Sequence, residues 1–225
     1  MKRLIIIVEG QTEKEFVEKS LRTFLISHGV FDVSAIMIQT SKGHKGGFVN
    51  YDHLKNDIHN ILKTEINVVV STFIDFFKIP TSFPKYKEAL EKNQIDSKIE
   101  TLLEGISENI NDKRFVPYIQ KHEFESLLFS SEEGFNEWFD DNWIIEQLTK
   151  IIQEFENPED INTGIETAPS KRIIKILEAK NQKYDKIAEG NLIAEEIGFE
   201  KILEKCPRFK NWINLLINKL KENNS

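Results

Sequence analysis

The chain has 225 residues, of which 40% are hydrophobic and 30% are charged, and its formal net charge at pH 7 is −7. This composition is typical of a globular domain with room for a helical addition, and it excludes an intrinsically disordered chain. The negative charge argues against a protein that coats nucleic acid non-specifically, because such binding neutralises phosphates with Lys and Arg. A metal-dependent nuclease is not excluded, since its carboxylates make the site acidic before cations bind.

Cysteine content and hydropathy indicate the compartment. The single cysteine, Cys206, excludes an internal disulfide and a cysteine-rich zinc site, and it suits a reducing environment. No run approaches the roughly 20 apolar residues of a membrane span, and no signal peptide precedes the first expected strand. We therefore expect a cytoplasmic protein with no membrane partner.

Hydrophobic periodicity predicts alternating strands and helices over the first 130 residues. Residues 4–8 are Ile- and Val-rich without alternation, as in a buried parallel strand, and helical spacing of apolar residues follows over 12–28. The expected elements after these are a strand over 31–39, a loop rich in Gly and Lys over 40–47, a helix over 51–64, a strand over 66–75, a helical stretch over about 85–110 and a strand over 114–120. This order predicts an α/β fold in which helices flank a mostly parallel sheet of about four strands.

Beyond residue 130 the pattern becomes helical. The segments with helical spacing are 132–156, 170–180, 185–205 and 208–222, with a polar break at 156–164. We therefore predict an α/β domain over residues 1–130 and a helical C-terminal region over 131–225 that packs on it to form one compact unit.

Acidic residues recur where the expected strands end. They are Glu9 and, one helical turn later, Glu13 after the first strand; Asp75 at the end of the third; and Glu123 and Glu125, with His122, after the fourth. Ligands of open α/β sheets bind outside the carboxyl ends of the strands, so we expect these acids to converge. Converging carboxylates repel one another unless cations intervene, and hard oxygen ligands suit Mg²⁺ or Mn²⁺.

Four motifs carry a resemblance to known families. The first strand and its acids, "VEGQTE", resemble the Toprim domain, and most closely that of OLD-type nucleases, in which a second acid four residues after the first also serves the metal site. Together with "DFFKIP", "YIQKHEFESLLF" and "TAPSKRI", over roughly residues 3–175, the chain resembles the DUF4276 family, a Toprim-like group. The resemblance implies a Toprim-like fold, a metal site, an ATPase partner protein and a role in bacterial antiphage defence.

The resemblance has one departure. The Toprim Asp-x-Asp motif places its second acid at position 77, where this chain has Phe77. Two interpretations follow: the site is degraded, or acids of the neighbouring strand end, Glu123 and Glu125, replace the missing aspartate. We favour replacement, because acids are hard to explain in the apolar surroundings of "HEFESLLF".

Each acid also has a structural interpretation. Glu9 and Glu13 suit the start of a helix, where the helix dipole favours an acid by about 0.3–1 kcal/mol. Glu123 or Glu125 would suit a helix cap. If the segment is helical, His122 and Glu125 share one face, a spacing that metal-binding pairs use but that is too short to be specific.

Basic residues in two segments are candidates for holding phosphate. Lys42 and Lys45 lie in the glycine-rich loop, and Lys171 and Arg172 begin an expected helix. With His122 they form the predicted substrate-binding set. The alternatives are a solvated loop and solvent-facing side chains.

The sequence thus favours a Mg²⁺- or Mn²⁺-dependent nuclease that hydrolyses DNA or RNA phosphodiesters. Its predicted catalytic residues are Glu9, Asp75 and Glu125, and Glu13 and Glu123 complete the predicted metal ligands. The alternatives are a non-catalytic recognition or effector subunit with a degraded site, and a phosphotransferase or hydrolase of small nucleotides. Nucleic acid is the expected partner, and a homo-oligomer is left open.

Overall fold

A computed structural model of the chain describes residues 2–41, 44–45, 48, 50–162 and 164–222. The chain separates into two compact units, which we describe one at a time. The first unit comprises residues 1–121 and 212–225, and the second comprises residues 122–211. The predicted boundary lay after residue 130. In the structure the second unit begins at residue 122, and the end of the last helix belongs to the first unit.

A parallel sheet forms the centre of the first unit. Within the described residues its strand order is β2-β1-β5-β6, with β7 also paired to β5. The bounds are β1 (Arg3–Val8), β2 (Val33–Met37), β5 (Val68–Asp75), β6 (Phe115–Val116) and β7 (Ile119–Gln120). Both central strands are almost entirely buried, which explains why their sequences are apolar without alternation. The predicted α/β fold with a mostly parallel sheet is confirmed.

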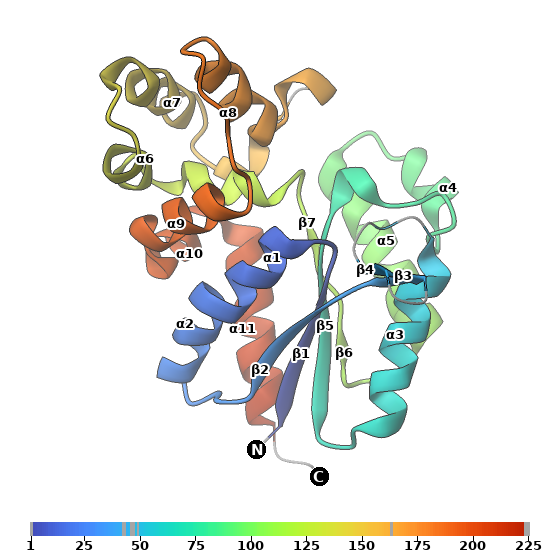
Figure 1. The fold of residues 1–225 in the computed structure, drawn as a ribbon. Coiled ribbons are helices and arrows are strands. Elements are labelled where there is room, and N and C mark those ends of the chain that lie inside the picture. Colours follow the sequence, from blue (N-terminus) through green and yellow to red (C-terminus); the bar gives the residue numbers. More distant parts are fainter. Residues whose placement is uncertain (1, 42–43, 46–47, 49, 163, 223–225) are drawn as a thin grey trace. The chain divides into compact units, whose positions relative to one another are not determined.

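Helices cover both faces of this sheet (Figure 1). On one face lie α1 (Gln11–Phe16), the π-helical turn η1 (Val17–Leu21), α2 (Arg22–Ser27) and the C-terminal part of α11 (Pro207–Lys221); on the other lie α3 (Tyr51–Thr64), α4 (Tyr86–Leu90) and α5 (Ile95–Ile110). The predicted helix over 51–64 matches α3. The predicted helix over 12–28 is interrupted by the π turn, and the stretch over 85–110 is divided into α4 and α5.

Two predicted segments of the first unit differ in detail. The expected strand over 114–120 is divided into β6 and β7, and Pro117, which has no backbone N–H to donate to the sheet, lies between them. The expected strand over 31–39 ends at Met37, and the following loop contains a short antiparallel pair, β3 (Gln39–Ser41) and β4 (His44–Lys45). Lys42 lies outside the described residues.

The described residues of the second unit form helices and the loops between them, without a strand. Its α-helices are α6 (Glu133–Trp138), α7 (Asn142–Glu154), α8 (Pro169–Glu178), α9 (Ala188–Ile197), α10 (Phe199–Lys205) and the start of α11; its 3₁₀ turns are η3 (Phe124–Ser130), η4 (Pro158–Asp160) and η5 (Ile165–Thr167). Close packing is visible at Gly134, where a Cβ would lie 2.7 Å from the carbonyl oxygen of Ile193. Among the described residues, no helix is long and apolar enough to cross a membrane.

Trp212 attaches the end of α11 to the sheet of the first unit. Its side chain is 3% exposed, and its indole Nε1–H donates to Ser71 Oγ of β5 at 2.9 Å. Its ring stacks on Tyr118, with centroids 4.4 Å apart and an interplanar angle of 9°, and it also contacts Phe73. One residue therefore supplies both apolar burial and a satisfied hydrogen bond to the central strand.

We predict that Trp212→Ala lowers the free energy of unfolding by about 3–5 kcal/mol, because it leaves a cavity and removes the hydrogen bond to Ser71. Leu215→Ala, in the same helix but 58% exposed, serves as the matched control and is expected to change the stability by less than about 1 kcal/mol. Urea denaturation followed by circular dichroism measures both. Equal losses in the two variants would contradict the attachment of α11 through Trp212.

Candidate functional site

Glu9 and Asp75 lie together at one edge of the sheet. Strand β1 pairs with β2 on one side and with β5 on the other, and all of these pairings are parallel. The next strand along the chain, β2, therefore lies on one side of β1, and the later strand β5 lies on the other. This reversal makes the β1–β5 boundary a topological switch point, where ligands of open α/β sheets bind. In this register Val8 is opposite Phe73, so that Glu9 and Asp75 both stand at the carboxyl ends of their strands. Both are buried, Glu9 at 5% and Asp75 at 0% exposure.

The two carboxylates share the ammonium group of Lys78. Lys78 Nζ lies 2.8 Å from Glu9 Oε1 and 3.9 Å from Asp75 Oδ2. Lys78 reaches them from the 3₁₀ turn η2 (Phe76–Lys78), which follows β5 directly and leaves the lysine side chain 47% exposed. Two buried carboxylates thus lie beside one lysine side chain that is accessible to solvent. Sequence reasoning missed Lys78, although its spacing of three residues from Asp75 was a usable signal.

Glu13 has a different partner. Its Oε2 accepts the backbone N–H of Gly10 at 3.0 Å, in the manner of the acid of a capping box at the start of α1. Gly10 has φ −140°, an extended conformation that any residue adopts, so no left-handed turn requires a glycine there. A Cβ at Gly10 would instead lie 3.1 Å from Glu13 Oε2, so the glycine makes room for this carboxylate. Glu13 as a metal ligand stays a prediction.

Glu123 belongs to the second unit and caps a helix. Its Oε2 accepts the backbone N–H of Ser170, in the first turn of α8, at 3.1 Å. Glu159 does the same for α11, accepting from the backbone N–H groups of Arg208 at 2.8 Å and Phe209 at 3.1 Å. Carboxylates satisfy such helix-start donors and interact favourably with the helix dipole. No local pattern pointed to Glu159, because its capping partners are about 50 residues away along the chain.

Glu125 is fully buried in the second unit, and its Oε1 lies 2.9 Å from Lys186 Nζ. Burial raises the pKa of Glu125 to about 7, and the neighbouring Glu123 adds to this effect, while Lys186 opposes it. Burial, together with the Glu125 charge, also raises the pKa of Tyr184 well above its ordinary value. Desolvation therefore outweighs the ion pair, so that Glu125 takes up a proton close to neutral pH.

His122 and Glu125 do not share a helical face. His122 has φ 67°, in the left-handed region, and the helical turn η3 begins only at Phe124. The buried imidazole instead lies with its Nδ1 3.5 Å from Asn162 Nδ2. A shared face of His122 and Glu125 required a helical segment, and the chain is not helical at His122.

The predicted phosphate-binding residues belong to both units. Lys45 lies in β4, and its side chain is outside the described part of the structure. Lys171 is exposed at the start of α8. Arg172 is held within its own unit: its Nε donates to the carbonyl oxygen of Thr167 at 2.9 Å, and its guanidinium lies 5.4 Å from the centre of the Phe155 ring. Arg172 thus has structural partners.

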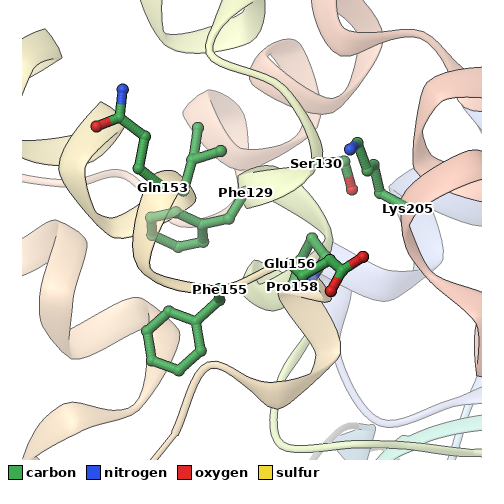
Figure 2. A pocket seen from close by; sticks show the side chains of 8 residues that line it. Phe129, Ser130, Gln153, Phe155, Glu156, Pro158 and Lys205 are labelled. Atoms are coloured by element: carbon green, nitrogen blue, oxygen red, sulfur yellow. The ribbon is translucent and has the colours of Figure 1, made fainter.

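A separate pocket of about 190 Å³ lies in the second unit (Figure 2). Phe129 and Phe155 form its apolar part, and Glu156 and Lys205 bring opposite charges to it. It is smaller than the pockets that hold drug-sized ligands. No residue of the predicted site lines it.

The described residues contain no group of three or more His, Cys, Asp or Glu side chains placed to hold a metal ion. What the structure does bring together is the pair Glu9 and Asp75 around Lys78. We refer to these three residues as the strand-end site. It offers carboxylate oxygens at a switch point and one solvent-accessible positive charge.

Comparison with known proteins places this arrangement in a family and a fold. A family model described as "Domain of unknown function (DUF4276)" matches residues 8–217. The C-terminal region of the Burkholderia pseudomallei OLD protein is similar in structure, with a TM-score of 0.51 and 14% identity, over 98% of this chain and 99% of that one. The corresponding region of the Xanthomonas campestris pv. campestris OLD protein aligns over 96% of each chain, with a TM-score of 0.44 and 13% identity. No curated protein matches the sequence.

We predict that the buried carboxyl group of Glu125 makes stability depend on pH. Its pKa in the folded protein, about 7, is higher than its ordinary value of 4.5. Its contribution to stability is therefore complete below about pH 4.5 and is lost as the pH rises through about 7. Relative to Glu125→Gln, the wild type is expected to lose about 3 kcal/mol of unfolding free energy between about pH 4 and about pH 8.

Urea denaturation of both proteins across this pH range measures the difference. Glu137→Gln, at an exposed position of the same unit, is the matched control and is expected to follow the wild type. A difference between the wild type and Glu125→Gln that does not change with pH would show that folding leaves the pKa of Glu125 unshifted.

Proposed function

We propose a nuclease function for this chain, which belongs to the DUF4276 family. In this proposal it uses Mg²⁺ or Mn²⁺ to hydrolyse phosphodiesters of DNA or RNA, and the strand-end site is its centre. Two observations support the proposal. The chain shares its fold with the OLD C-terminal region, and two acids stand at the topological switch point of its sheet. An ATPase partner and a role in antiphage defence follow from the family resemblance and stay predictions, as do Glu123 and Glu125 as metal ligands.

The observation that carries the proposal is the convergence of Glu9 and Asp75 on one cationic group. Burying two acids at adjacent strand ends is costly unless a positive charge lies between them. Lys78 supplies that charge, but it reaches the acids from a short surface turn and is half exposed. A structural ion pair does not need this access to solvent, whereas a site that exchanges cations does.

The donor set fits Mg²⁺ or Mn²⁺. Mg²⁺ is commonly bound by one or two carboxylates, with waters and substrate phosphates completing its shell, rather than by a cage made of protein alone. A pair of acids therefore suffices, even though no larger group of ligands occurs among the described residues. Such a cation would supply Lewis-acid stabilisation of the charge on the transferring phosphate.

The chain's own residues have distinct tasks in this proposal. Glu9 and Asp75, both buried, would hold the cation through their carboxylate oxygens. Lys78 would donate to a non-bridging phosphate oxygen when the acids hold a divalent cation instead of its ammonium group. Glu13 is a positioning residue, because its bond to the Gly10 N–H holds the turn that follows Glu9.

One observation favours the alternative of a non-catalytic recognition subunit. The Glu9–Lys78 distance of 2.8 Å is that of a complete ion pair, so the charge of Glu9 is compensated without a metal. In that case the strand-end site is a structural network, and Phe77 in place of a second aspartate marks a degraded centre. The two functions differ in whether divalent cations bind at the site.

We predict that Glu9→Gln and Asp75→Asn each reduce Mn²⁺-dependent cleavage of plasmid DNA or structured RNA by about 10²-fold or more. The reason is that a lost metal ligand removes several kcal/mol of transition-state stabilisation. Gel assays with purified protein measure the rates. Glu100→Gln, an exposed acid of α5, is the control and should cleave like the wild type. Wild-type activity in the Glu9 and Asp75 variants would remove the strand-end site from the reaction.

We predict a metal-dependent rescue for Lys78→Met. In EDTA this variant should lose about 1–3 kcal/mol of unfolding free energy, because Glu9 and Asp75 lose their shared ammonium group. Mn²⁺ should then stabilise the variant more than it stabilises the wild type, since it no longer competes with the lysine. Thermal unfolding with and without Mn²⁺ tests this.

Lys19→Met is the control for that experiment, because Lys19 forms an exposed helix pair with Glu15. It should show neither the loss nor the rescue. A destabilised Lys78→Met variant that does not respond to Mn²⁺ would instead support the structural network.

A further inference from the structure

A pocket in the first unit is lined in part by the turn that carries Lys78 of the strand-end site. It has a volume of about 210 Å³, and its wall is formed by apolar and aromatic side chains from η2, α4 and α5, with Lys98 as the charged residue among those that line it. Phe76 and Phe77 come from η2, Tyr86 and Leu90 from α4. This volume suits one flat ring system better than a drug-sized ligand.

Two large apolar side chains are exposed in this pocket. Phe77 is 46% exposed and Leu90 is 58% exposed, and both belong to the pocket wall. The Phe77 ring is tilted by 57° to the Phe76 ring, with centroids 5.6 Å apart, so that a pair of aromatic rings lies in the wall. Single exposed apolar residues need no explanation, but exposed residues gathered around a hollow mark a binding surface.

The pocket and the strand-end site are built from the same three-residue turn. Asp75 ends β5, Phe76 and Phe77 follow it, and Lys78 closes the turn with its ammonium group between Glu9 and Asp75. A base at the Phe77 ring and a phosphate at Lys78 would therefore contact neighbouring residues of one turn. Phe77 occupies the position at which the Toprim pattern would have its second aspartate.

We propose that this pocket binds an unstacked nucleobase adjacent to the phosphodiester at the strand-end site, with Phe77 as its stacking surface. The inference rests on the proposed function, and it deepens it by naming a single-stranded or locally opened nucleic acid as the substrate. Every base has an apolar face that stacks on aromatic side chains, so this contact is tolerant of sequence. The charges agree with this occupant, because Lys98 in the wall and Lys78 in the turn are both positive and suit the phosphates on either side of a base.

Binding of two charge-matched strands tests the proposal. One is a fluorescently labelled DNA strand of ten nucleotides. The other is a labelled abasic strand with the same number of phosphates. Fluorescence anisotropy in EDTA, and again in Ca²⁺, measures their affinities for the full chain, with strand length checked afterwards on a gel. The wild type should prefer the strand that carries bases.

Substitutions then locate the preference. Phe77→Ala should weaken binding of the base-bearing strand by about 5- to 100-fold, the range for one base stacked on an aromatic ring, and leave the abasic strand unaffected. Phe77→Trp should retain the preference, because the indole offers the same flat surface. Ile66→Ala, which removes an apolar side chain that is 86% exposed elsewhere in the unit, is the matched control and should bind as the wild type does.

Each result decides the proposal. Equal affinity for the two strands, no binding of either, or a base preference that survives Phe77→Ala would overturn the nucleobase pocket and point to another occupant, such as an apolar side chain of a partner protein. The proposed nuclease function is judged separately by cleavage: a chain that prefers bases through Phe77 but cleaves nothing keeps the pocket and loses the reaction.

Discussion

The parallel pairing of β1 with β5 is the constraint on which the rest of the structure depends. It places two buried strands side by side with their carboxyl ends at one edge, so that Glu9 and Asp75 emerge together. A slip of one residue would turn every side chain of a strand to the opposite face. The burial of both strands on both faces makes such a slip costly, and the position of the two acids is therefore as well determined as the core itself.

Apart from Glu125, which pairs with Lys186, the buried and half-buried acids described above fall into two classes according to their partners. Glu13, Glu123 and Glu159 accept backbone N–H groups near the starts of helices, where a carboxylate satisfies donors that the helix leaves open. Glu9 and Asp75 instead share the side-chain ammonium of Lys78. A backbone donor fixes an acid permanently, whereas a half-exposed lysine is a partner that another cation can replace. This difference is why the proposed function centres on the strand-end site.

Much of the fold was predictable because apolar periodicity reports burial. The helix α3 was expected over 51–64 and has those bounds, and each of the four expected strand segments contains a strand of the parallel sheet. The details that were missed depend on contacts or on single residues. Pro117 divides the last expected strand, and the left-handed conformation of His122 delays the following helical turn, so that His122 and Glu125 do not share a helical face.

By itself the sequence determined which acids stand at strand ends, because a charged residue that interrupts a buried apolar run marks the end of a strand. It thereby identified Glu9 and Asp75. Only the tertiary structure decided what each acid contacts. The register of β1 with β5 places Glu9 and Asp75 around Lys78. In the second unit, Glu123 caps α8 and Glu125 pairs with Lys186. Contacts between residues far apart along the chain produce no local sequence pattern. The sequence therefore predicts that an acid stands at a strand end, but not which residue it contacts.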